Sequence, residues 1–159
     1  MNIFRRKKKS ETKNVALLVD GPNIIRKEFS IDLDELRKKA EKYGRIMIGK
    51  VFLNQFASEK LVEAISNQGL EPKVTLAGET ESDVDVAVAV AAVEAGYNEK
   101  IDTVIIASRD ADYLPAIQKI KELGKEVVII GMNPGFSKAL QHAADHVEIL
   151  SKRKGKWKI

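Results

Sequence analysis

Residues 101–131, IDTVIIASRDADYLPAIQKIKELGKEVVIIG, contain an apolar run, a helical pattern and a second apolar run in direct succession. The run 101–108 is rich in β-branched residues, which is typical of a buried strand. Residues 112–123 have helical spacing and stop before Gly124, a common helix terminator. Residues 126–131 form a further strand-like run. Strand, helix and strand in this order predict a βαβ unit, and therefore a parallel sheet covered by helices.

The same alternation continues on both sides of this stretch. Segment 82–95 begins like a strand, but its length, its alanines and the closing Gly96 favour a buried helix. We expect the other strands at 14–20, 45–53, 72–76 and 146–150, and the last of these should be an edge strand. We expect the other helices at 31–44, with Ser30 as the N-cap, and at 58–68 and 137–143. The predicted fold is a three-layer α/β/α arrangement with a mainly parallel central sheet, which is Rossmann-like.

The composition fits one soluble domain. The 159 residues are 44% hydrophobic and include no cysteine, which excludes disulfides and thiolate chemistry. The longest apolar run near the middle, 86–93, has 8 residues, far short of the ~20 that span a membrane. The basic N-terminus is followed by the polar residues 10–14 rather than by an apolar segment. We therefore expect a cytoplasmic protein without membrane insertion.

The net charge of +4 is unevenly distributed. Residues 1–13 and 151–159 each carry +5, which leaves −6 on residues 14–150. We expect a domain at 14–150 between two basic tails. Such tails suit a phosphate backbone, so RNA is the expected partner, although solubility or an anionic membrane surface also accounts for them. The tail residues expected to bind RNA are Arg5, Arg6, Lys7, Lys152, Arg153, Lys154 and Trp157, the last by stacking on a base or else by anchoring the tail.

Acidic residues end or follow several of the predicted strands. They are Asp20, then Asp83 and Asp85, then Asp110 and Asp112. The carboxyl ends of parallel strands meet at one edge, where ligands of open α/β sheets bind.

Each acid also has a structural explanation. Residues 82–85 match a capping box, Asp110 suits an N-cap, and Asp112 complements a helix dipole. As a group, however, crowded carboxylates repel each other unless they share a cation. Oxygen ligands favour Mg²⁺ or Mn²⁺, ions that support phosphodiester hydrolysis.

Three motifs in this order resemble the NYN domain family, including its LabA-like group, within the PIN-like nuclease superfamily. Residues 19–24, VDGPNI, are similar to the first-strand motif of that family. Residues 83–90, DVDVAVAV, resemble its central helix motif, V-D-V-x-L-A. Residues 107–115, ASRDADYLP, resemble its S-G-D-S-D-F-x-P motif. The likeness extends over about residues 14–150 and implies a PIN-like fold and a role in cleaving or processing RNA.

The resemblance also implies roles for individual residues. The acids that it assigns to the metal are Asp20, Asp85, Asp110 and Asp112. Asn23 would complete the catalytic set by orienting a water or a phosphate, and Ser108 would support the loop. Asp83 is either an extra ligand or a helix-start acid, and Asp145 is a peripheral candidate.

Two positions of the third motif depart from the family pattern. Arg109 stands where the family has glycine, and Ala111 replaces a small polar residue. Arg109 either binds a phosphate or pairs with a carboxylate and weakens metal binding. The sequence thus supports a metal-dependent ribonuclease, with a non-catalytic RNA-binding or regulatory module as the alternative.

Other functions have less support. A haloacid-dehalogenase-type phosphohydrolase would need an acid two residues after Asp20, and that position is Pro22. His142 and His146 have the spacing of some zinc sites but lack a further ligand. No glycine-rich nucleotide motif is present. A homodimer is compatible with the sequence, which does not fix the oligomeric state.

Overall fold

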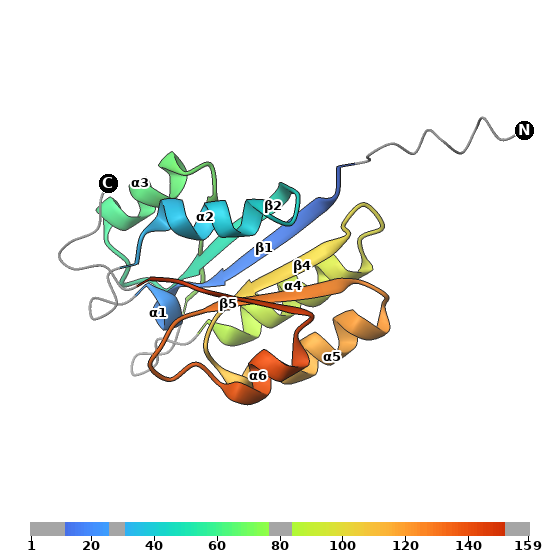
Figure 1. Ribbon diagram of the computed structural model, residues 1–159. Coiled ribbons are helices and arrows are strands. Elements are labelled where there is room, and N and C mark those ends of the chain that lie inside the picture. The colour runs from blue at the N-terminus through green and yellow to red at the C-terminus, as the bar shows by residue number, and fades with distance from the viewer. Residues whose placement is uncertain (1–11, 26–30, 77–83, 152–159) are drawn as a thin grey trace, which may run out of the picture.

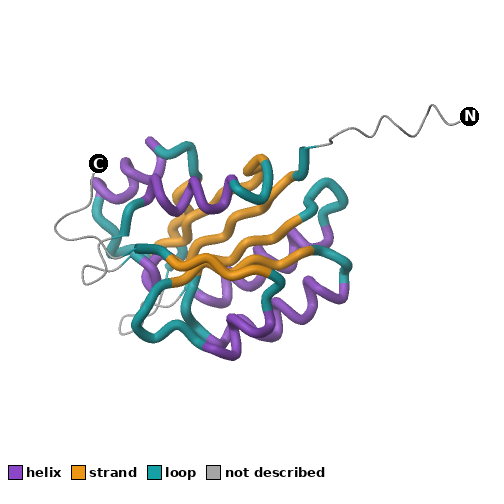
Figure 2. The backbone as a smooth tube through the Cα atoms, viewed as in Figure 1, coloured by secondary structure: helices purple, strands orange, loops and turns teal. Residues whose placement is uncertain are grey.

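A computed structural model describes residues 12–25, 31–76 and 84–151 of the protein. Within these residues, helices cover both faces of a central sheet, as Figures 1 and 2 show. The strands are β1 (Asn14–Asp20), β2 (Arg45–Leu53), β3 (Glu71–Val74), β4 (Thr103–Ala107), β5 (Glu126–Gly131) and β6 (His146–Ile149). All neighbouring strands pair in parallel, in the order β3-β2-β1-β4-β5-β6. The predicted α/β/α fold is confirmed, and the described sheet is entirely parallel.

The helices divide between the two faces in chain order. One face carries α1 (Gly21–Ile24), α2 (Leu33–Glu41) and α3 (Glu59–Asn67). The other carries α4 (Asp85–Tyr97), the 3₁₀ helix η2 (Ala111–Tyr113), α5 (Leu114–Glu122) and α6 (Lys138–Ala143). None of the helices among these residues is long and apolar enough to cross a membrane.

Strand β1 lies at the centre of the sheet, and its side chains alternate between two hydrophobic cores. Val15, Leu17 and Val19 point into the core beneath α1, α2 and α3. Ala16 and Leu18 point into the core beneath α4, α5 and α6. Because side chains on a strand alternate between faces, the next residue in the second series, Asp20, faces the side of α4 and α5.

Several helix boundaries differ from the sequence prediction. Helix α2 begins at Leu33 because the Asp32 side chain accepts a hydrogen bond from the Asp34 amide, so Ser30 is not its N-cap. Helix α4 begins at Asp85 with Val84 as its N-cap and without a side-chain cap, so the predicted capping box at 82–85 is wrong. A short helix, α1, follows β1 directly and was not among the predicted helices.

Two further differences concern the ends of elements. The helix predicted at 112–123 is divided into η2 and α5, with a proline in the first turn of α5. Proline lacks a backbone donor and is tolerated only where no intrahelical bond is needed, at the start of a helix. Strand β3 covers 71–74 rather than 72–76. The final strand, β6, lies at an edge as predicted.

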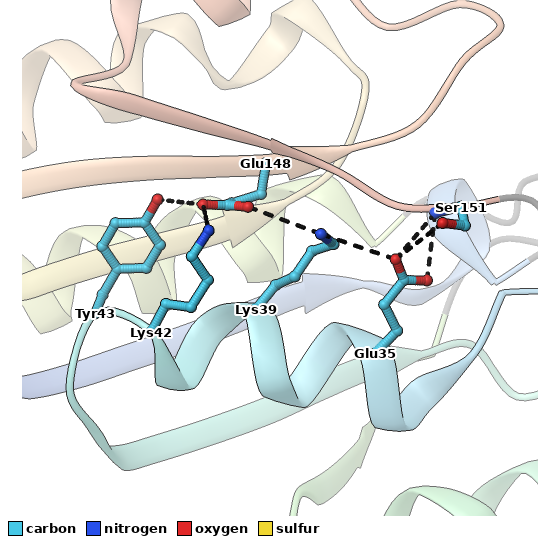
Figure 3. A network of polar contacts seen from close by, with 6 residues as sticks. All are labelled: Glu35, Lys39, Lys42, Tyr43, Glu148 and Ser151. Atoms are coloured by element: carbon cyan, nitrogen blue, oxygen red, sulfur yellow. Dashed lines mark hydrogen bonds and ion pairs between the residues drawn. The ribbon is translucent and has the colours of Figure 1, made fainter.

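A polar network joins α2 and the residues just after it to β6 and to Ser151 (Figure 3). Glu148 on β6 is buried and accepts hydrogen bonds from the Lys42 ammonium, at 2.9 Å, and from the Tyr43 hydroxyl. Glu35 on α2 accepts a bond from the Ser151 amide at 3.2 Å. These contacts hold the edge strand β6 against the helix that packs over the centre of the sheet.

Candidate metal centre

The candidate site lies at the carboxyl ends of β1 and β4. From β1 the sheet extends through β2 and β3 in one direction, and from β4 through β5 and β6 in the other. Ligands of open α/β sheets bind where the strand order reverses in this way. Val19 pairs with Ala107, so Asp20, the last residue of β1, and Ser108, the first residue after β4, lie at the same level.

Three aspartates converge at this position. Asp85, Asp110 and Asp112 each offer a carboxylate oxygen, and these oxygens all lie within 4.8 Å of one another. Asp85 is the first residue of α4, whereas Asp110 and Asp112 belong to the loop and 3₁₀ helix after β4. Asp85 and Asp110 are half-buried and Asp112 is exposed, so the cluster is open to solvent on one side.

The loop after β4 is held by its own polar groups. The buried Ser108 hydroxyl accepts a bond from the Asp110 amide at 3.1 Å, and its own amide donates to Ile130 of β5. Asp110 Oδ1 accepts from the Asp112 amide at 3.0 Å, which makes Asp110 the N-cap of η2. The capping explanation of Asp110 is therefore correct for one of its oxygens, and it does not conflict with the position of the carboxylate in the cluster.

Asp20 lies beside the cluster rather than within it. It is only 2% exposed, and it is not part of the group whose oxygens lie within 4.8 Å. Its Oδ2 accepts a hydrogen bond from the Tyr113 hydroxyl at 2.7 Å, and its Oδ1 accepts from the Asn23 amide at 3.3 Å. The second bond caps α1, which is why a short helix forms directly after the strand.

Tyr113 is the site residue that sequence analysis missed. Its side chain is 1% exposed, and its hydroxyl is directed at Asp20. Burial, then the Asp20 carboxylate, and then the charges of Asp85 and Asp110 raise the pKa of Tyr113. The same hydroxyl therefore lies close to Asp20 and to two members of the cluster. The third motif, at residues 107–115, contained a signal for this role. The resembling family has phenylalanine at this position of the motif, whereas this chain has tyrosine.

Asn23 and Arg109 bind each other. The Asn23 Oδ1 accepts from the Arg109 backbone amide at 2.9 Å and from its Nε at 3.3 Å. The guanidinium also donates to the Pro134 carbonyl at 2.8 Å. The side-chain oxygen of Asn23 thus orients Arg109. Its role toward a water or a phosphate, as the resemblance implies, remains a prediction.

Other predicted residues lie elsewhere. Asp145 accepts a hydrogen bond from the Val127 amide at 2.8 Å, near the start of β5. It therefore lies at the amino ends of the strands, whereas the cluster lies at their carboxyl ends. The Nε2 of His146 is 3.7 Å from Glu126. Within the described residues, neither histidine joins a cluster of three possible metal ligands. The remaining candidates lie outside the described residues; they are Asp83, Arg5, Arg6, Lys7, Lys152, Arg153, Lys154 and Trp157.

The donor set fits a hard divalent cation. Among the described residues, no lysine or arginine forms an ion pair with Asp85, Asp110 or Asp112. Carboxylates at this spacing repel each other unless a cation or a proton intervenes. Three carboxylate oxygens on an open surface leave room for water and for a phosphate oxygen, which is the arrangement that Mg²⁺ and Mn²⁺ prefer.

Comparison with known proteins agrees with this architecture. Residues 14–151 match the NYN domain family. An uncharacterized protein of Methanocaldococcus jannaschii is 56% identical over 142 residues, which are 89% of this chain and 57% of that protein. This chain thus spans little more than half the length of that relative. A crystal structure of a protein of unknown function from Vibrio parahaemolyticus superimposes with a TM-score of 0.78 at 20% sequence identity. The superposition covers 88% of this chain and 94% of the Vibrio chain, and the two proteins share the fold. The chain belongs to the NYN domain family, part of the PIN-like nuclease superfamily.

Proposed function

We propose that this protein is a divalent-metal-dependent ribonuclease that cleaves RNA phosphodiesters at the aspartate cluster. The observation that carries the proposal is the convergence of Asp85, Asp110 and Asp112 within 4.8 Å at the switch point of the sheet. Membership of a PIN-like nuclease family supports RNA as the substrate. The VDGPNI motif favours the LabA-like group within that family.

Asp85, Asp110 and Asp112 would hold the cation. Mg²⁺ or Mn²⁺, when bound, supplies Lewis-acid chemistry, because it lowers the pKa of a water and stabilises charge on the phosphate. The half-buried Asp85 and Asp110 direct their oxygens from two different elements, while the exposed Asp112 leaves the site open on the solvent side. The cluster is therefore accessible from solvent on the side of Asp112.

Asp20 would act beside the cation as a fixed negative charge. The Tyr113 hydroxyl and the Asn23 amide fix its two oxygens, and its burial prevents free rotation. A carboxylate fixed in this way is preorganised and needs no rearrangement as the reaction proceeds. We assign Asn23 a role in positioning Arg109, whose guanidinium lies beside the site and is expected to meet a substrate phosphate.

A non-catalytic RNA-binding module is the second candidate. It is favoured by Arg109, because the resembling family has glycine at this position and a guanidinium next to the cluster competes with a cation. In the structure this side chain donates to Asn23 and Pro134. Among the described residues it forms no ion pair with Asp85, Asp110 or Asp112, so it does not neutralise the clustered acids, and this favours the nuclease over the binding module.

Cleavage of labelled single-stranded RNA tests the proposal. Wild type would be compared with Asp110→Asn in Mg²⁺, Mn²⁺ and EDTA, and Mn²⁺ affinity would be measured by calorimetry. The matched control is Glu63→Gln, an exposed acid on α3 without a hydrogen bond or ion pair among the described residues. We expect metal-dependent cleavage in wild type and in the control, and a loss of at least about 100-fold in Asp110→Asn.

The alternative predicts a different pattern. RNA binding without cleavage in every metal, together with no calorimetric Mn²⁺ signal, would establish the binding module instead. In that case Arg109→Gly, which restores the family residue, would be expected to recover Mn²⁺ binding. Cleavage that persists in EDTA and in Asp110→Asn would rule out both this site and a metal-dependent mechanism.

A further inference from the structure

Helix α4 is apolar around its whole circumference, although only one of its sides packs against the protein. Its sequence, DVAVAVAAVEAGY, carries a single charged residue after Asp85. The buried residues Val88, Ala92 and Ala95 belong to the core with β1, β4 and α5. A helix that is hydrophobic on every side is normally buried on every side. The outward side of α4 is therefore a surface that a partner would cover.

The outward side carries a continuous line of large side chains, here called the α4 stripe: Val86, Val90, Val93 and Tyr97. The spacing i, i+4, i+7 and i+11 places these residues along one side of the helix. Val86, Val90 and Tyr97 are 73%, 55% and 61% exposed. Single exposed apolar residues are common on protein surfaces, whereas an aligned series marks an interaction site.

A second surface lies beside the stripe, where α4 borders strand β2. A hollow of about 220 Å³ lies between α4 and β2, and its lining includes Ile48, Lys50, Ala91 and Glu94. We call this side of the stripe the β2 flank. Across the described residues, neither Lys50 nor Glu94 takes part in an ion pair or a side-chain hydrogen bond. One positive and one negative group on the same flank thus make no ion pair with another described residue.

The chemistry of this surface selects a protein and not RNA. RNA binding depends on several lysines and arginines that neutralise phosphates. The stripe itself has neither, although the Lys119 ammonium lies 5.9 Å from the centre of the Tyr97 ring, and the one lysine of the neighbouring hollow is accompanied by Glu94. The surface is also complementary to itself. A two-fold axis between two antiparallel α4 helices places stripe against stripe and keeps both β2 flanks on the same side. This arrangement allows the long side chain of each Lys50 to reach the Glu94 of the other copy. The two helix dipoles are antiparallel, which is favourable.

We propose that the α4 stripe and the β2 flank form the homodimer interface of this protein, in which Lys50 of one copy pairs with Glu94 of the second. The 13 residues of α4 extend about 20 Å. Specific interfaces bury about 800 Å² on each partner, so the β2 flank is needed in addition to the helix. This inference is independent of the nuclease proposal, because none of these side chains belongs to the aspartate cluster.

Sedimentation velocity of the full chain over a range of concentrations tests the interface. We expect a dimer for wild type and a monomer for Val90→Arg, because the new charge would be buried between two stripes. The control is Ile149→Arg, which alters an apolar side chain of similar exposure, 48%, on β6, and which should remain a dimer. Circular dichroism would show that each variant is folded.

Charge exchange provides a second test that keeps the apolar stripe intact. Glu94→Lys should weaken dimerisation at least tenfold, and adding Lys50→Glu should restore it. Because the chain has no native cysteine, Val90→Cys should also form a disulfide-linked dimer under mild oxidation, whereas Ile149→Cys should not. A wild-type monomer at all concentrations, or a dimer that tolerates Val90→Arg, would overturn the interface. Failure of the double charge exchange to restore the dimer would overturn the Lys50–Glu94 pairing.

Discussion

Tyr113 links the core of the molecule to its candidate site through one hydroxyl group. Its ring packs in the apolar core beneath α4 and α5, and its hydroxyl donates to the buried Asp20 at 2.7 Å. Hydrogen bonds to charged groups contribute about 1.5–3 kcal/mol, and an unsatisfied buried acceptor is costly. Removing this one oxygen should therefore lower stability and release Asp20.

We expect Tyr113→Phe to lower the free energy of unfolding by about 1.5–3 kcal/mol, measured by urea denaturation. Mn²⁺ affinity should fall as well, because Asp20 loses its fixed orientation. Tyr97→Phe is the control, since the Tyr97 hydroxyl makes no hydrogen bond within the described residues and its side chain is 61% exposed. If Tyr113→Phe had wild-type stability and wild-type Mn²⁺ affinity, the assigned role of the hydroxyl would be wrong.

Glycine is required at position 21, the first residue of α1, because the backbone of β2 comes close to it there. A Cβ atom at this position would lie 2.3 Å from the Phe52 carbonyl oxygen of β2, which cannot move without disturbing the sheet. Gly21→Ala should therefore displace α1 and weaken the bond between Asp20 and the Asn23 amide. We expect lower thermal stability and lower Mn²⁺ affinity together.

Gly49→Ala provides the comparison for Gly21→Ala. The nearest atom to a Cβ at Gly49 is the end of the Leu70 side chain, at 2.7 Å, and a flexible side chain can rotate away. Its unfolding temperature should fall less, and its Mn²⁺ affinity should not change. Equal losses in the two variants would show that the Phe52 carbonyl is not the decisive contact.

At the scale of elements, α2 and β6 are joined by the charged network around Glu148. Burial raises the pKa of Glu148, but the bonds and charges of Lys42, Tyr43 and Lys39 outweigh it, so the pKa lies below its usual value. The ionised form is thus favoured in the folded state. The stabilisation is present above the pKa of an unfolded glutamate and is lost as the pH falls through the lower, folded value.

Glu148→Gln tests this dependence on pH. At pH 7 the variant should be less stable than wild type by about 1 kcal/mol, in the range of partly exposed ion pairs. The difference should shrink as the pH falls through the lowered pKa of Glu148, because the wild-type carboxylate then also becomes protonated. Urea midpoints of both proteins between pH 3 and 8 would show this convergence. A difference independent of pH would assign the effect to packing.

Burial also raises the pKa of Tyr43, to about 12, with a further contribution from its bond to Glu148. The neutral phenol is therefore favoured in the folded state. Its contribution is present below the pKa of an unfolded tyrosine and is lost as the pH rises through about 12. The network thus loses its stabilising effect at both extremes of pH.

Sequence patterns predict the strands and helices that are buried on both sides more accurately than they predict the geometry of the candidate site. Strand β1 was predicted at its observed bounds because an uninterrupted apolar run with turn residues after it has few other interpretations. Helix α4 starts three residues later than predicted because the pattern of 82–85 imitates a capping box. Local patterns cannot show that Val84 occupies the N-cap, because that depends on how the helix packs against β1.

The site was predicted in part for a similar reason. The order of strands and helices places Asp85, Asp110 and Asp112 at one edge, so their convergence follows from topology. Strand periodicity also places Asp20 on the same face. Its hydrogen bond with the Tyr113 hydroxyl, which spans 93 positions in the sequence, was not predicted. Contacts of that kind are set by packing and leave no local pattern.

At the scale of the whole molecule, charge separates the body of the protein from its termini. The segment 14–150 carries −6, and the two terminal segments carry +5 each. An acidic body repels RNA, so the basic termini should supply most of the attraction. Affinity that arises from phosphate neutralisation falls with salt in proportion to the number of phosphates contacted.

Replacing Lys152, Arg153 and Lys154 by glutamine in the full chain tests this distribution. RNA affinity at low salt should fall at least tenfold, and the slope of log K against log salt should decrease by about 2 to 3. Fluorescence anisotropy with the Asp110→Asn background would measure binding without cleavage. Replacing Lys60, Lys73 and Lys100, which are exposed and make no ion pair among the described residues, is the matched control. An unchanged slope would show that the C-terminal segment does not bind the RNA backbone.

The central position of β1 has a consequence for biosynthesis. Asp20 lies in the first strand, whereas its partner Tyr113 and two of the clustered aspartates come about 90 residues later. Parallel strands joined over such distances pair late, and chains emerge from the ribosome with the N-terminal part first. A nascent chain therefore cannot assemble the cluster until β4 and η2 have been synthesised. Under the proposed function, the chain would therefore stay inactive while most of it is still being translated, next to the ribosomal RNA and the messenger that encodes it.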